Sequence, residues 1–161
     1  MYDVCLGLFF VLLLYGAICD VATFEIPNFV SVVGALLFLP ATVGLDWEFS
    51  EILQHFLAGC MVFLLGLILF AVKVLGGGDV KVLSAAGVWS GFSNLLVLFF
   101  WVAVIGGVLT LILILFRQVA MPRRFQSLRW IARLHGHTGV PYGVAISFGT
   151  LLSFSEIYQQ L

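Results

Sequence analysis

The chain has 161 residues, of which 63% are apolar and only 9% charged, and its formal net charge is -1. A soluble globular domain of this size needs far more polar surface, so the composition excludes one and places the chain in a lipid bilayer. Backbone groups in lipid must bond to one another, and the apolar runs here are long and do not alternate. The sequence therefore predicts an all-α, polytopic integral membrane protein and not a barrel.

Six apolar stretches follow one another and predict about six transmembrane helices. They are residues 4–19, 29–45, 52–72, 75–92, 95–116 and 140–154. Most approach the ~20 residues that cross a hydrocarbon core, and the fourth would span roughly 27 Å as a helix. No basic residue and no convincing cleavage site flank the first run, which predicts a retained helix. We expect one membrane-embedded domain over residues 1–161, with no detectable repeat.

The basic residues support the count of six. Lys73 and Lys81 flank a glycine run, and five arginines lie in the longest polar loop: Arg117, Arg123, Arg124, Arg129 and Arg133. Six spans place both groups in the cytoplasm, whereas five would put the arginine loop outside, against the positive-inside tendency. Asp20, Glu25 and Asp79 are then the acids on the cytoplasmic side. The other five acids face outward: Asp3, Asp46, Glu48, Glu51 and Glu156.

The sequence predicts no metal and no cofactor. The three cysteines, Cys5, Cys19 and Cys60, lie in apolar segments without CxxC pairing, as expected of small buried hydrophobes. His135 and His137 are two residues apart, but no third ligand accompanies them, and a solvated loop is the better interpretation.

Two carboxylates are the candidate catalytic groups. Asp20 directly follows the first span and Asp79 begins the fourth, so the predicted topology brings both to one membrane face. Each alone could be an ordinary loop acid, and Gly76-Gly77-Gly78 could be a simple turn, although three glycines also permit close backbone approach. Two adjacent carboxyls tend to share one proton, which suits water activation in peptide hydrolysis. Helix polarity favours Asp79 as the anion and Asp20 as the acid.

Several neighbouring residues are candidates for support. Pro27 fits the start of the second helix, and Asn28 adds a donor and an acceptor near Asp20. Glu25 is either a third acid of the site or a loop residue facing the headgroups. Lys81 either stabilises the nearby carboxylate or extends to the headgroups.

Three motifs together resemble the type IV prepilin peptidases within the GxGD intramembrane aspartyl proteases. They are Asp20 seven residues before Pro27-Asn28, Gly76-Gly77-Gly78-Asp79-Val80-Lys81, and Pro141-Tyr142-Gly143 at the start of the last helix. The resemblance implies an aspartic-type endopeptidase of the cytoplasmic (inner) membrane, with Asp20 and Asp79 catalytic and its active site facing the cytoplasm. It implies substrate or structural support from the remaining motif residues: Pro27, Asn28, Gly76, Gly78, Lys81, Pro141 and Gly143.

The same resemblance implies the substrate, the N-terminal leader of a prepilin or pseudopilin precursor. The short chain is similar to the small form of Flp or Tad pilus systems, and it lacks the double CxxC loop of larger enzymes that also methylate their product. We expect no N-methyltransferase activity, membrane lipids as partners, and no nucleic acid. One departure is the 21–25 loop, which carries Glu25 and no basic residue. It would favour a basic leader electrostatically, and we expect the 117–133 arginines to contact lipid instead.

Three alternatives remain. An archaeal-type preflagellin peptidase would share this chemistry. A presenilin-like protease would have Tyr-Asp where this chain has Cys19-Asp20, and a Pro-Ala-Leu-Pro segment where it has Pro141-Tyr142. A non-catalytic membrane scaffold or transporter subunit would show internal repeats and charges near mid-span, whereas the charges here cluster at span ends.

Overall fold

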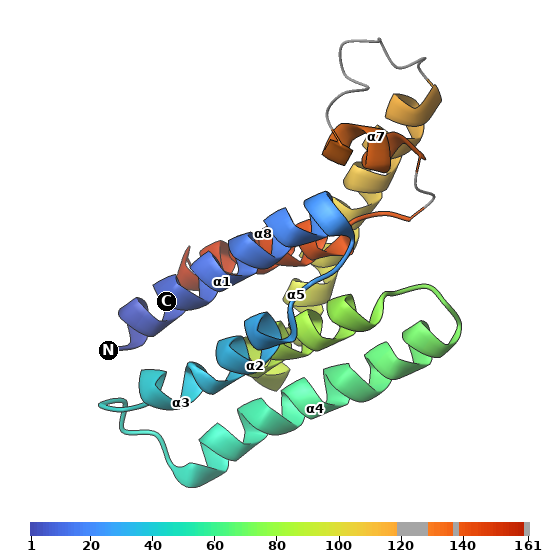
Figure 1. The fold of residues 1–161 in the computed structure, drawn as a ribbon. Helices are drawn as coiled ribbons and strands as arrows, with labels where there is room; N and C mark the ends of the chain where they lie inside the picture. The colour runs from blue at the N-terminus through green and yellow to red at the C-terminus, as the bar shows by residue number, and fades with distance from the viewer. Residues whose placement is uncertain (119–128, 137–138, 160–161) are drawn as a thin grey trace.

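The computed structural model describes residues 1–118, 129–136 and 139–159 (Figure 1). All regular structure within these residues is α-helical. The helices are α1 (Tyr2–Thr23), α2 (Asn28–Leu36), α3 (Phe38–Ala41), α4 (Phe49–Ala71), α5 (Gly77–Gln118), α7 (Arg129–Gly136) and α8 (Tyr142–Gln159). The prediction of an all-α protein is confirmed.

The helices form two packed groups that α5 connects. Figure 1 shows α1 and α8 side by side, and α4 alongside the first part of α5. The second part of α5 packs against α8, and α2 packs against both α5 and α1. Phe9, Phe38 and Trp89 meet in the core between these groups, where the rings of Phe9 and Trp89 stack with centroids 4.9 Å apart. The indole nitrogen of Trp89 donates to the carbonyl oxygen of Gly34 at 2.8 Å, which ties α5 to α2.

The second apolar stretch is two short helices and not one continuous span. We expected a helical segment over 29–45, but the chain divides between Leu36 and Phe38 and leaves helical structure after Ala41. Pro40 explains the division, because a proline ring clashes with the carbonyl four residues earlier, here that of Leu36, and cannot donate to it.

The fourth and fifth stretches are joined into one kinked helix. We expected them to be separated at residues 93–94, but both residues are helical, and the break lies at Gly91, with φ 63° and ψ 173°. Only glycine adopts this backbone conformation without strain. Side chains bind carbonyls at the kink: Nδ1 of His55 donates to Val88 O at 2.7 Å, and Nδ2 of Asn94 donates to Ser90 O at 3.1 Å.

Three helices of the described residues are long and apolar enough to cross a bilayer: α1, α4 and α5. Residues 28–41 and 142–155 are shorter apolar helical segments. Large apolar side chains cover the outside of the bundle, as a protein surrounded by lipid requires. The chain is therefore a polytopic membrane protein, and each of the six predicted stretches is at least partly helical, while the count of six crossings stays a prediction.

Glycines bring α4 and α5 into close contact, and this contact makes a testable prediction. A Cβ at Gly59 would overlap Cγ2 of Val88 and lie 3.0 Å from the carbonyl oxygen of Ser84. Small residues at such positions let helices in lipid approach closely. We expect Gly59→Ala to reduce the free energy of unfolding by about 1–3 kcal/mol. Thermal unfolding in detergent measures this, with Gly7→Ala as the control because no atom lies within 4 Å of that added Cβ. Equal losses in both variants would contradict the prediction.

Candidate active site

Asp20 lies in the last turn of α1, where its carboxyl group is held by the start of another helix. The side chain is only 5% exposed. Its Oδ2 accepts a hydrogen bond of 2.7 Å from the backbone N–H of Gly143, the second residue of α8. Helix N-termini bear unpaired N–H groups and a partial positive charge, so this position stabilises a carboxylate. The last helix therefore fixes the orientation of Asp20.

Asp79 lies in the first turn of α5 and is 9% exposed. Its Oδ2 accepts a hydrogen bond of 3.0 Å from the backbone N–H of Gly76, directly before the helix. Each candidate carboxyl thus accepts one backbone N–H at a helix start. Because both carboxyls accept a hydrogen bond at a helix start, helix polarity does not distinguish Asp79 as the anion from Asp20 as the acid. The sequence alone does not reveal that α8 begins against Asp20.

The two carboxyl groups line one cavity of about 780 Å³ and are close enough for their charges to interact. The cavity wall is otherwise formed by the α1 end, the α4–α5 connection and the segment before α8: Phe24, Phe70, Ala71, Lys73, Val74, Leu75, Gly76, Gly139, Val140 and Tyr142. A cavity with apolar walls and a few polar groups is typical of a ligand-binding or active site.

Ile26 packs between the helices that carry the acids, and glycines make room for it. A Cβ at Gly78 would lie 3.3 Å from Cβ of Ile26, and a Cβ at Gly143 would lie 2.9 Å from its Cδ1. The predicted support residues Gly78 and Gly143 therefore permit close approach of α5 and α8 to the 24–27 connection, whereas a Cβ at Gly76 would lie 2.9 Å from Oδ2 of Asp79. Ile26 stands in the sequence motif directly before Pro27, but its packing between helices was not predicted.

Phe24 and Lys73, which the sequence analysis did not select, also line the cavity. They are the two non-glycine residues with positive φ in the described part of the chain, at 58° and 61°. Phe24 ends α1 as a left-handed cap, and Lys73 follows α4. Backbone strain of this kind collects at functional sites. Only Lys73, the basic residue before the glycine run, could have been noticed in the sequence.

The predicted support residues Asn28 and Lys81 lie outside the cavity wall. Both are exposed, and the Nζ of Lys81 donates to Oδ1 of Asn28 at 2.7 Å. Asn28 therefore braces α2 against α5, and the two roles considered for Lys81 stay predictions. Pro27 is the residue before α2, in extended conformation, and Pro141 is buried directly before α8.

The Asn28–Lys81 bond makes a quantitative prediction. Because both side chains are exposed, their coupling energy should be small, about 0.2–1 kcal/mol. A double-mutant cycle with Asn28→Ala and Lys81→Met, followed by thermal unfolding in detergent, measures it. A coupling above about 2 kcal/mol would show that the pair is far better shielded from water than its exposure indicates.

Two arginines of the polar loop bind backbone carbonyls. Arg117 donates to Leu134 O at 3.0 Å and to Gly139 O at 2.6 Å, and Arg133 donates to Ala22 O at 2.8 Å. Arg117 thus holds one edge of the cavity, since Gly139 lines it. Arg123, Arg124 and His137 lie outside the described residues, and nothing is described of the side chains of Arg129 and Glu156.

Glu25 is exposed and does not line the cavity, so the structure gives no support for it as a third acid.

The prediction of three buried cysteines is wrong in part, because Cys5 is buried, Cys19 is half-buried and Cys60 is exposed. Cys60 lies on the apolar outer surface of α4, where a thiol is compatible with lipid. Within residues 1–118, 129–136 and 139–159, no group of three or more metal-binding side chains occurs.

Comparison with known proteins bears on the first two motifs of this site. The sequence profile of the type IV leader peptidase family matches residues 7–111, a range that contains Asp20, Asp79 and the intervening helices. No curated protein and no solved structure matches the chain. The Pro141-Tyr142-Gly143 motif follows the matched range, and its connection to the site rests on the hydrogen bond to Asp20. The match covers well over half of the sequence, and the chain belongs to the type IV leader peptidase family.

Proposed function

We propose that the chain is a single-domain aspartic endopeptidase that removes the N-terminal leader from type IV, Flp-like prepilins or pseudopilins. The observation that carries this proposal is the pair of buried carboxyls on one cavity, each fixed by a backbone N–H. Such a pair can hold a water molecule between its oxygens. Family membership supports leader peptides as the substrate class.

The proposed reaction divides acid and base work between Asp20 and Asp79. One carboxylate accepts a proton from the water while the water oxygen bonds to the peptide carbonyl carbon, and the protonated partner donates to the carbonyl oxygen. Collapse of this intermediate breaks the C–N bond as a proton passes to the leaving amine. Because the two titrations belong to the pair, the initial roles are not assigned to one residue or the other.

We place the site at the cytoplasmic face of the inner membrane. The positive-inside tendency supports this orientation, since Lys73 lines the cavity and Arg117 and Arg133 bind close to its edge. The absence of a CxxC pair in the sequence supports leader removal without N-methylation.

Co-expression with a small Flp-like prepilin tests the function, with leader removal followed by intact mass. The expected product lacks the leader and carries an unmethylated N-terminus. A preflagellin precursor and an unrelated membrane protein with a cleavable signal serve as comparison substrates. Preferential cleavage of preflagellin would replace the proposed substrate, and no cleavage of any precursor would contradict the proposed function.

A further inference from the structure

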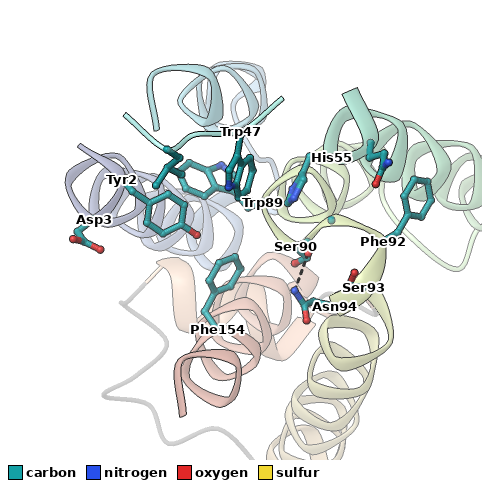
Figure 2. A pocket seen from close by; sticks show the side chains of 13 residues that line it. Tyr2, Asp3, Trp47, His55, Trp89, Ser90, Phe92, Ser93, Asn94 and Phe154 are labelled. Carbon is teal, nitrogen blue, oxygen red and sulfur yellow. Dashed lines mark hydrogen bonds between the residues drawn. The ribbon is translucent and has the colours of Figure 1, made fainter. Parts of the chain in front are cut away.

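A second cavity lies at the kink of α5, at the opposite end of the helices from Asp20 and Asp79. It has a volume of about 570 Å³ and is lined by residues from the start of α1, the segment before α4, α4 itself, the kink and the end of α8. Figure 2 shows His55, Ser90 and Asn94 towards its centre, with the rings of Tyr2, Trp47, Trp89 and Phe154 on one side and Phe92 on the other. The proposed peptidase reaction uses none of these residues.

Ser90 gives the first indication of a ligand. Its side chain is 2% exposed and lines the cavity, yet its Oγ has no hydrogen-bond partner among the described residues. A buried hydroxyl group without a partner costs about 1–3 kcal/mol. Serine hydroxyls elsewhere in this bundle bond to nearby carbonyls, as Ser84 does to Val80 O at 2.7 Å and Ser147 to Leu13 O at 2.8 Å. Ser90 is therefore an exception that a bound polar group would satisfy.

The kink determines the hydrogen-bonding character of the other central side chains. A carbonyl oxygen can only accept a hydrogen bond, so the bond between Nδ1 of His55 and Val88 O requires the hydrogen to be on Nδ1. In the neutral imidazole ring the other nitrogen, Nε2, is then an acceptor. The amide of Asn94 likewise uses Nδ2 to donate to Ser90 O, and its Oδ1 is an acceptor. These two acceptor atoms are not engaged with the described residues, and the hydroxyl of Ser90, which can accept or donate, adds a third polar atom, so the cavity favours a ligand that donates hydrogen bonds.

Charge and aromatic surface favour a cationic donor. The lining residues include one acid, Asp3 at the outer edge of the view in Figure 2, and neither lysine nor arginine. Half-buried rings of Tyr2 and Trp47 stand beside the buried indole of Trp89. Aromatic faces attract ammonium groups and repel anions, and a wall without basic residues cannot balance a phosphate on its own.

We propose that this cavity binds a primary ammonium group, which donates to Ser90 Oγ, His55 Nε2 and Asn94 Oδ1 between the aromatic rings. The same group occurs in an ethanolamine lipid headgroup and in a free small amine. A headgroup would enter from the surrounding membrane and leave its phosphate outside the cavity, whereas a free amine would enter from the aqueous side.

Native mass spectrometry of the full, delipidated chain in detergent tests the proposal. Phosphatidylethanolamine, phosphatidylcholine, phosphatidylglycerol and free ethanolamine are added separately. We expect retention of phosphatidylethanolamine about tenfold above phosphatidylcholine, whose trimethylammonium group cannot donate. Retention of the lipid without free ethanolamine identifies the headgroup as the source, and retention of ethanolamine at comparable affinity identifies a soluble amine.

Ser90→Ala is the decisive variant, because it removes an acceptor together with an unsatisfied buried group and should not impair folding. We expect it to abolish the tenfold preference, whereas Ser84→Ala, the same change elsewhere in α5, retains it. Thermal unfolding verifies that both variants fold. Equal retention of the three lipids by the native chain, or a preference that Ser90→Ala leaves unchanged, would overturn the proposal. The native comparison remains decisive even if Ser90→Ala unfolds.

Discussion

Replacing either Asp20 or Asp79 with asparagine is expected to slow leader removal by roughly 10²–10⁴-fold, the contribution of a positioned acid or base. Asparagine keeps the shape of the side chain but cannot exchange a proton. Its Oδ1 can still accept the backbone N–H of Gly143 or Gly76, which hold the native carboxyls at 2.7 and 3.0 Å. The expected loss therefore concerns proton transfer and not the fold. Initial rates of leader removal in detergent measure it, by intact mass.

The double variant should lose little more than either single variant, because the two carboxyls act as one unit. Asp46→Asn is the matched control, since this exposed acid lies in the loop before α4, away from the cavity. Its cleavage rate should equal that of the native chain. If one aspartate tolerated asparagine with native activity while remaining folded, the two-carboxyl mechanism would be wrong.

The placement of charged residues in the sequence predicted that Asp20 and Asp79 lie at the same membrane face. The arginines and lysines imply which ends of the apolar stretches share a membrane face, and Asp20 and Asp79 stand at two of those ends. The structure places both on one cavity. The all-α fold followed from composition, because a chain this apolar leaves the backbone few alternatives to helix.

Other features depend on contacts between distant segments and could not be predicted in this way. The bond from Gly143 to Asp20 joins residues 123 positions apart, and Lys81 and Asn28 are separated by 53. The packing of α8 on α1 creates the bond between Gly143 and Asp20, and the packing of α2 on α5 creates the bond between Asn28 and Lys81. The polar residues Ser93 and Asn94 marked a break in apolarity close to Gly91, but they could not show that one helix continues through them with a kink at the glycine. Pro40, by contrast, was a visible signal for the division of α2 from α3.

Gly143→Ala is expected to have the second largest effect on cleavage, through the position of Asp20. A Cβ at this residue would lie 2.9 Å from Oδ2 and 3.1 Å from Cβ of Asp20, and 2.9 Å from Cδ1 of Ile26. The carboxyl or the start of α8 must move, and the hydrogen bond of 2.7 Å is then lost or weakened. Hydrogen bonds to charged groups contribute about 1.5–3 kcal/mol. A comparable loss of transition-state stabilisation lowers the cleavage rate by roughly 10–150-fold.

Gly107→Ala is the matched control for this variant, because no atom lies within 4 Å of the Cβ added there on α5. It should cleave at the native rate and unfold at an equal or slightly higher temperature, since alanine favours helix over glycine by about 1 kcal/mol. The comparison separates steric displacement of Asp20 from a general effect of losing a glycine. Native cleavage rates in Gly143→Ala would show that the start of α8 does not position Asp20 for the reaction, and the pair would then depend on α1 and α5 alone.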